Sequence, residues 1–345
     1  MTRHAIDVHT HVYLKHYMDV LRRRNLVPRI AAGKDAAGDE RLIILPGEDV
    51  EKSTAAGRPV GGEFWDPARK LAFMDAHDIA VSVISLANPW LDFLPAAEAV
   101  PLATALNDEM QAICAASQGR LYGFGVLPTP APAACADELR RLMRLDRLRG
   151  VIIGARGLGK GLDDPALTPV WHAAEETGAT IFVHPHYGVA TEHFAGTGHT
   201  LFLALGFTFE TTIAVSRLIL SGVLDRHENL QLLIAHAGAT LPYLAGRLDG
   251  CVATDYSVDF KLRHKPSDYL KRMTFDAIAY HGAALKCLVE LVGADRVMFG
   301  TDYGPVPLDP MEHVDIVNTL GIAPADKEKI LWRNAAAFFN LEVAG

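Results

Sequence analysis

The sequence of 345 residues predicts a (β/α)8 barrel of the α/β class. Three observations lead to this prediction. The length suits one barrel, because such barrels run from about 200 to more than 400 residues as a single unit. Short apolar runs rich in β-branched residues recur with helix-compatible stretches between them, a pattern typical of parallel βα units. Several of the 15 histidines directly follow these runs. A doubly wound open sheet is the alternative fold.

The predicted strands read as continuous apolar runs because both faces of a barrel strand are buried. They are Ala5–Val8, Ile79–Ser85, Leu121–Val126, Gly150–Ile153, Thr180–Val183, Leu230–Ala235, Met273–Phe275 and Arg296–Phe299. The stretches between them have helical patterns and boundaries. The predicted helices are Ala97–Ser117, Pro132–Leu145, Leu167–Thr177, Phe209–Ser221 and Ala283–Val292, with Pro324–Phe339 as a terminal pair or one long helix.

The first and second predicted strands are separated by about seventy residues, far more than a βα unit needs. Within this gap, Pro28–Asp66 is rich in Gly, Pro and charged residues. We expect an inserted loop region over the active site, where substrate contacts or a lid often lie. A surface insertion without such a role is the alternative. No other linker or low-complexity stretch suggests a second domain, so residues 1–345 are expected to form a single barrel domain.

Composition argues against several classes of function. The formal net charge is −8 and Lys and Arg form only short clusters such as Arg22–Arg24, so nucleic acid is not an expected partner. No apolar run approaches the roughly 18 residues of a membrane span, and Asp7 comes before any apolar stretch that could serve as a signal peptide. We therefore expect a cytoplasmic protein without a membrane partner. The four cysteines form no C-x-x-C pair and are expected to be reduced thiols.

Residue types that bind metals stand at the ends of several predicted strands. His9 and His11 close the first strand, and residues two apart in an extended chain point the same way. His184 ends the fifth strand, His236 the sixth and Asp302 the eighth. Each alone is compatible with a capping or turn residue. Because the carboxyl ends of barrel strands share one mouth, their joint occurrence predicts a metal centre there.

Longer motifs surround these residues. They are His9-Thr10-His11, Val183-His184-Pro185, His236-Ala237-Gly238 followed by Gly246-Arg247-Leu248-Asp249, Met298-Phe299-Gly300-Thr301-Asp302 and the closing Asn334-Ala335-Ala336. In these motifs, over nearly its whole length, the chain resembles the amidohydrolase superfamily and, within it, the metal-dependent decarboxylases related to aminocarboxymuconate semialdehyde decarboxylase. It is similar more narrowly to isoorotate decarboxylases, which remove CO2 from 5-carboxyuracil, in the stretches Val81–Trp90, Gly157–Pro165, His184–Gly188 and Leu203–Phe207.

The resemblance implies an amidohydrolase-like barrel with one zinc ion. The implied ligands are His9, His11, His184 and Asp302, and His236 stands beside the metal as an acid or base. Manganese is an alternative metal, since imidazole and carboxylate ligands suit both ions. No organic cofactor is expected.

The end of the fourth strand favours a one-metal site independently. Binuclear members of the superfamily bridge two metals with a Lys or Glu at this position. Here the strand closes as Val151-Ile152-Ile153-Gly154-Ala155, and the following Arg156 cannot bridge cations. The remaining histidines, such as His77, His172 and His227, are expected at the surface.

Three polar side chains are candidates for substrate binding. Arg247 lies eleven residues after His236, where relatives carry an arginine that binds the substrate carboxylate, in some across a dimer interface. A salt bridge from Arg247 to Asp249 is the alternative. Asn88 follows the second strand and offers a donor and an acceptor to a pyrimidine edge, although Asn before Pro is also a routine turn former. Arg58, in the insertion, is a further carboxylate candidate.

Three aromatic side chains are candidates for the pocket wall. Phe207 and Trp90 are expected to line a flat pocket for a planar ring, with a purely core role as the alternative. After Asp302 the chain reads Tyr303-Gly304-Pro305-Val306, where the isoorotate decarboxylase motif has His-Pro-Phe. We therefore expect that an aromatic wall is missing or is replaced by Tyr303.

These inferences predict the zinc-dependent, non-oxidative decarboxylation of a planar unsaturated or aromatic carboxylic acid. In one route the carbon that bears the carboxylate is protonated by Asp302 or His236 before CO2 leaves. In the other, zinc-bound hydroxide adds to the substrate with His236 as general base, and the sequence does not choose between the two routes. The favoured substrate is 5-carboxyuracil, giving uracil and CO2. A hydroxybenzoate or aminocarboxymuconate semialdehyde is the alternative within this class, and a mononuclear hydrolase of a lactone or amide is the alternative outside it. The resemblance also implies a homodimer.

Overall fold

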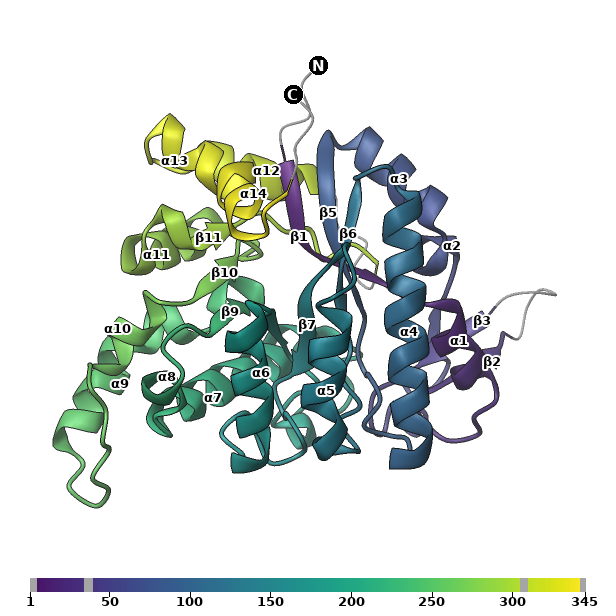
Figure 1. Ribbon diagram of the computed structural model, residues 1–345, viewed down its shortest axis with the longest axis horizontal. Helices are drawn as coiled ribbons and strands as arrows, with labels where there is room; N and C mark the ends of the chain where they lie inside the picture. Colours follow the sequence, from purple (N-terminus) through teal and green to yellow (C-terminus); the bar gives the residue numbers. More distant parts are fainter. Residues whose placement is uncertain (1–4, 34–39, 305–309, 342–345) are drawn as a thin grey trace.

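Parallel strands form a nearly closed barrel at the centre of the molecule (Figure 1). The computed structural model describes residues 5–33, 40–304 and 310–341. The strands, in their order around the sheet, are β1 (Ala5–Val12), β5 (Ile79–Leu86), β6 (Leu121–Gly125), β7 (Leu148–Gly154), β8 (Thr180–His184), β9 (Gln231–Ile234), β10 (Thr274–Asp276) and β11 (Val297–Met298). The Val8 N–H donates to the Phe299 carbonyl oxygen at 3.0 Å, which brings the end of the sheet back to its start. The predicted (β/α)8 barrel is confirmed.

Helices cover the outside of the barrel (Figure 1). The longer ones are α3 (Pro67–Ala76), α4 (Ala96–Ala116), α5 (Pro132–Leu142), α6 (Thr168–Thr177), α7 (Phe207–Leu220), α9 (Leu241–Thr254), α11 (Gly282–Val292) and α12 (Pro310–Thr319). The shorter ones are α1 (Lys15–Arg22), α2 (Gly62–Trp65), α8 (Val223–Arg226), α10 (Pro266–Leu270), α13 (Pro324–Glu328) and α14 (Asn334–Phe338). The five internal helices expected from sequence are present with small shifts at their ends.

The C-terminal helical region runs without a break from α13 through a π-helical turn, Lys329–Arg333, into α14. Of the two alternatives predicted from sequence, the structure therefore has the single long helix, which contains a local π-helical turn. Sequence reasoning missed α9, which contains Pro242, Gly246 and Gly250. Pro242 lies in the first turn, where its missing N–H is tolerated. Each glycine weakens an isolated helix, so α9 forms here because tertiary packing stabilises it.

The segment 28–66 contains regular structure where a loop region was predicted. Strands β2 (Arg29–Ala32), β3 (Glu40–Ile43) and β4 (Arg58–Pro59) form an antiparallel sheet, and α2 follows. Ile30 pairs with Leu42 in this sheet and both side chains are buried. These strands were not predicted because they are short and the residues around them are mostly Gly, Pro and charged, so no alternating apolar pattern stands out.

The helical stretch Phe202–Leu220 is long and apolar enough to cross a membrane by length and composition alone, with a mean hydropathy of 1.5. The stretch is not a continuous apolar run, because Glu210 and Arg217 interrupt it. Half of its most apolar window is buried inside the protein. A core helix of a barrel has the same properties, so the stretch is weak evidence for a membrane span.

Candidate metal centre and substrate pocket

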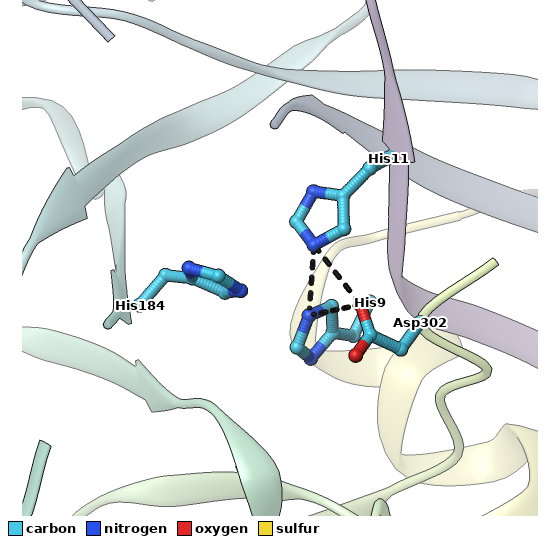
Figure 2. A group of neighbouring side chains, drawn as sticks. All are labelled: His9, His11, His184 and Asp302. Atoms are coloured by element: carbon cyan, nitrogen blue, oxygen red, sulfur yellow. Dashed lines mark hydrogen bonds and ion pairs between the residues drawn. The ribbon is translucent and has the colours of Figure 1, made fainter. Parts of the chain in front are cut away.

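Four buried side chains converge at the carboxyl ends of the strands (Figure 2). They are His9 and His11 on β1, His184 at the end of β8, and Asp302 shortly after β11. One potential ligand atom from each residue lies within 4.8 Å of the others. The structure thus brings together the four residues that the resemblance implied as ligands, from three strands far apart in sequence.

The spacing of the ligand atoms suits a single small cation. The Nε2 atoms of His9 and His11 are 3.1 Å apart, and Asp302 Oδ1 lies 3.5 and 3.3 Å from them. Zinc bonds of about 2.0–2.1 Å place neighbouring tetrahedral ligands roughly 3.3 Å apart. The observed distances scatter around that value, so these residues fit the metal that the sequence predicted.

Each imidazole is held by its other ring nitrogen. The pairs are His9 Nδ1 with Asp276 Oδ2 at 2.6 Å, His11 Nδ1 with Ser85 Oγ at 3.0 Å, and His184 Nδ1 with the Pro185 carbonyl oxygen at 2.7 Å. His11 and Ser85 are also direct neighbours in the register of β1 and β5. Such contacts orient a histidine and make its Nε2 a better metal ligand.

Asp276, at the end of β10, organises much of the site, and sequence reasoning missed it. Its Oδ2 accepts hydrogen bonds from His9 Nδ1 and from the His236 backbone N–H, while Oδ1 accepts from the N–H groups of Ala237 and Ile278. The side chain is fully buried. The sequence does contain an indication of this role. Asp276 ends β10, just as the predicted ligand Asp302 follows β11.

His236 lies beside the four ligands and lines the same cavity. Its Nε2 is 3.5 Å from Asp302 Oδ2, and its ring centroid is 5.1 Å from that of His9. The residue has a positive φ of 56°, a conformation that costs energy outside glycine and is often found at functional sites. Two backbone hydrogen bonds to Asp276, from His236 and Ala237, hold this turn in place.

The electrostatics of the centre favour a bound cation. Burial lowers the pKa of His11 to about 4 and, with the neighbouring imidazoles, holds the pKa of His184 well below its ordinary value. Burial opposes charge on His9 as well, but the carboxylates of Asp302 and Asp276 raise its pKa to about 10. Burial would also raise the pKa of Asp302, yet the imidazoles around it hold that pKa well below its ordinary value. The two carboxylates therefore attract positive charge to this point.

A network of buried hydrogen bonds stabilises the segments that carry the metal-ligand candidates. Asp7 accepts hydrogen bonds from the backbone N–H and the hydroxyl of Thr301, next to Asp302, and from the His9 backbone N–H. Lys70 donates to the Thr10 hydroxyl at 2.7 Å. Burial raises the pKa of Asp7 and lowers that of Lys70. These contacts tie the segment that carries Asp302 to β1, which carries His9 and His11.

A cavity of about 1090 Å³ opens above the centre. His11, His184, His236 and Asp302 contribute to its wall, and most of the remaining lining is apolar. Leu42, Ile44, Leu45, Arg58 and Phe64 supply one side of it, all from the segment 28–66. The inserted segment thus lies at the pocket.

Three of the predicted substrate contacts line this cavity: Asn88, Arg58 and Phe207. The Asn88 amide nitrogen donates to the His186 carbonyl oxygen at 2.7 Å, which fixes the amide plane. Arg58 Nε lies 3.8 Å from Glu48 Oε1, and its Nε and Nη2 are buried without a hydrogen-bond partner in the described part of the chain. Buried donors of this kind are suited to a polar ligand group.

The other two aromatic candidates do not line the described cavity, which agrees with the alternatives of a core role for Trp90 and a missing aromatic wall at Tyr303. Trp90 packs edge-on against His184 and His186 and donates its indole N–H to the Leu86 carbonyl oxygen. Tyr303 stacks on Phe73 with Lys70 over its ring. Trp90 is buried in the core and Tyr303 is half-buried, and neither contributes to the described lining of the cavity. Pro305 and Val306, which follow Tyr303, lie outside the described residues.

Arg247 lies on the exposed side of α9, away from the cavity of its own chain. The alternative role predicted for it, a salt bridge with Asp249, is also not what the structure has. Asp249 accepts hydrogen bonds from the backbone N–H and hydroxyl of Ser267 at 2.8 and 2.6 Å. Sequence spacing placed Arg247 near His236, but the helix carries its side chain outward.

The end of β7 leaves little space for a bridging side chain. A Cβ atom on Gly154 would lie 2.6 Å from His186 Nδ1 and 2.7 Å from the Trp90 ring. Gly154 pairs in register with the ligand His184. The tight packing agrees with the sequence inference of a one-metal site, because a lysine or glutamate here would displace both rings.

Comparison with known proteins identifies the family. Residues 6–341 match a family model described as Amidohydrolase. The chain belongs to this amidohydrolase family. It is 27% identical over 340 residues to 2-amino-3-carboxymuconate-6-semialdehyde decarboxylase from Dictyostelium discoideum, covering 98% of this chain and 92% of that protein.

Solved structures extend the comparison. The crystal structure of IDCase (isoorotate decarboxylase) from Metarhizium anisopliae, in apo form, is 38% identical with a TM-score of 0.92, covering 99% of this chain and 98% of that one. The 5-carboxyvanillate decarboxylase from Sphingomonas paucimobilis is 26% identical with a TM-score of 0.81, covering 99% and 100%. These comparisons confirm the predicted family and the predicted enzyme class, a metal-dependent carboxy-lyase of aromatic acids.

Proposed function

We propose that this amidohydrolase removes CO2 from 5-carboxyuracil with a single zinc ion. The observation that carries the proposal is the position of His236 and Asp302. Both line a mainly apolar cavity, directly beside three histidines that fit a metal. The similarity to IDCase, at 38% identity over nearly the whole chain, supports this substrate.

The chain's own residues supply the proton donor for the reaction and the groups that orient the substrate. A divalent metal held by His9, His11, His184 and Asp302 would act as a Lewis acid toward a ring oxygen and a carboxylate oxygen of the substrate. A proton passes from His236 or Asp302 to the ring carbon that bears the carboxylate. The bond from that carbon to the carboxylate then breaks, CO2 leaves, and the electron pair restores the conjugated ring.

Polar groups at the pocket favour a pyrimidine over a benzene ring. Arg58 supplies buried N–H donors and Asn88 a fixed amide, whereas Phe207 offers an apolar face. A uracil ring carries carbonyl and N–H groups along its edge, and such groups need partners when they are buried. A hydroxybenzoate carries fewer of these groups along its ring edge. Hydroxybenzoates and aminocarboxymuconate semialdehyde remain the alternative substrates.

A second copy of the chain is proposed to complete the pocket. Leu205, Phe209 and Ile213 form an apolar stripe at helical spacing, between 37% and 50% exposed, and Tyr243 on α9 is 85% exposed. All but Ile213 also line the cavity. A homodimer that covers this stripe would bring the partner's α9 close, and with it an arginine for the substrate carboxylate.

The proposed function includes three further points. Manganese can replace zinc in the metal centre, no organic cofactor is needed, and the protein is cytoplasmic.

Release of CO2 from a panel of acids tests the proposed function. The panel contains 5-carboxyuracil, 2,4- and 2,6-dihydroxybenzoate, 6-methylsalicylate and aminocarboxymuconate semialdehyde, each with zinc-loaded and chelator-treated protein. We expect CO2 and uracil from 5-carboxyuracil, lost on chelation and restored by zinc. Turnover of a benzoate alone would retain the reaction and replace the substrate. Lactone or amide hydrolysis without CO2 from any acid would favour the hydrolase alternative.

A further inference from the structure

A second group of metal-binding side chains lies outside the barrel, away from the cavity. His172 and Glu175 are separated by three positions on α6, and His227 lies in the loop between α8 and β9. One ligand atom of each residue lies within 4.8 Å of the other two. Because β9 runs from Gln231 toward His236 at the mouth, this group is at the opposite end of the strand from the metal centre.

Two of the three side chains are already fixed. His227 Nδ1 is 2.8 Å from Glu175 Oε2, and the Asn229 backbone N–H donates to Glu175 Oε1 at 3.0 Å. The His227 side chain is only 2% exposed and that of Glu175 is 20% exposed. His227 was expected at the surface, and the structure corrects this. These contacts hold the loop before β9 against α6.

The third side chain adds a feature that the loop contact does not require. His172 is exposed on α6, and its ring stands edge-on to His227 with centroids 4.6 Å apart and an interplanar angle of 75°. It brings a second imidazole to a pair that is already hydrogen-bonded. Two imidazoles and one carboxylate, with an open position toward solvent, are a ligand set that zinc accepts.

We propose that His172, Glu175 and His227 form a second binding site for a divalent transition-metal ion, with Zn²⁺ as its occupant. Tetrahedral zinc places ligand atoms roughly 3.3 Å apart. The contact between His227 and Glu175 therefore opens by roughly 0.5 Å, and the widest pair closes by up to about 1.5 Å. The exposed His172 side chain achieves this closure by a rotamer change, which costs little at the surface. Water completes the coordination.

Such an ion would connect α6 to the loop that leads into β9. A ligand that binds only the folded chain stabilises it, so zinc would raise the melting temperature through this site. The ion would lie at the amino-terminal end of β9, the end that contributes to stability in barrels of this type. We therefore assign the site a structural role that is separate from decarboxylation.

Zinc stoichiometry tests the proposal on the zinc-loaded enzyme. The unaltered chain, His172→Ala and His193→Ala are dialysed against the same micromolar free Zn²⁺, and bound zinc per chain is measured by atomic emission. His193 is the matched control because its side chain is 76% exposed and lies 3.7 Å from Glu192, yet it belongs to no group of three ligands in the described chain. Both substitutions are at exposed positions, so both variants are expected to fold.

We expect the unaltered chain and His193→Ala to bind one more zinc ion per chain than His172→Ala. Added zinc should raise the melting temperature of the first two proteins further than that of the third. Equal zinc in all three proteins, or an equal shift in melting temperature, would overturn the proposal. Neither readout depends on turnover, so the outcome is independent of the proposed decarboxylase activity.

Discussion

Replacing Asp276 by Asn tests whether this residue sets the affinity of the metal centre. Each carboxylate oxygen accepts two N–H groups: Oδ2 from His9 and His236, and Oδ1 from Ala237 and Ile278. An asparagine has one oxygen and one NH2 group, so either orientation places a donor against two donors. The charge that holds the proton on His9 Nδ1 is lost as well.

The magnitude follows from the contact between His9 and Asp276. A hydrogen bond to a charged group contributes about 1.5–3 kcal/mol, which corresponds to roughly a 10- to 150-fold change in an equilibrium constant. Loss of a carboxylate that orients a metal-bound histidine is known to cost about 10- to 100-fold in affinity or activity. We therefore expect zinc affinity in Asp276→Asn to fall by roughly 10- to 100-fold.

Competition with a chromophoric chelator measures this affinity directly. Asp225→Asn is the matched control, since Asp225 is also a buried carboxylate and accepts hydrogen bonds from the Tyr269 hydroxyl and the Arg263 backbone N–H. Circular dichroism establishes that both variants are folded. If folded Asp276→Asn binds zinc as tightly as Asp225→Asn and the unaltered chain, the reasoning about the anchored imidazole is refuted.

Three other perturbations test separate parts of the site. His236→Ala should retain zinc and lose turnover by roughly 100-fold or more, the scale of a general acid or base; zinc analysis of the variant decides this, and an empty centre would show that His236 is a ligand. Arg247→Ala should raise KM for the acid with little change in kcat if the partner's arginine binds the carboxylate, and an unchanged KM in steady-state assays would exclude that role. Burial would raise the pKa of Glu48, but hydrogen bonds from His199 and two backbone N–H groups, with Arg58 nearby, lower it below 4.5. The stability that this carboxylate contributes is present above about pH 4.5 and lost as pH falls through its lowered pKa. The melting temperature of Glu48→Gln should therefore lie below that of the unaltered chain at neutral pH and approach it in acid, and a constant difference would contradict this.

The sequence predicted the barrel because its strands are buried on both faces and stand apart as apolar runs. It also pointed to the mouth of the barrel, since His9, His11, His184, His236 and Asp302 follow those runs and parallel strands end together. These inferences need only the chain direction and the alternation of side chains along a strand. They required no knowledge of how the helices pack.

Other features depend on where side chains point once distant segments meet. Asp276 anchors His9 because closure of the barrel brings the end of β10 close to β1, and Arg247 faces outward because α9 turns it from the cavity. Trp90 and Tyr303 follow strand ends, as the ligands do, yet Trp90 packs into the core and Tyr303 stacks on Phe73.

The His172, Glu175 and His227 group illustrates the same division. Sequence reasoning saw only isolated surface histidines, because more than fifty residues separate His172 from His227. The barrel places α6 against the loop before β9 and so brings their rings together. Residue type and position in a strand or helix determine which chemistry is available, while the distances between ligand atoms, and therefore the choice between a metal site and a surface contact, arise only from long-range packing.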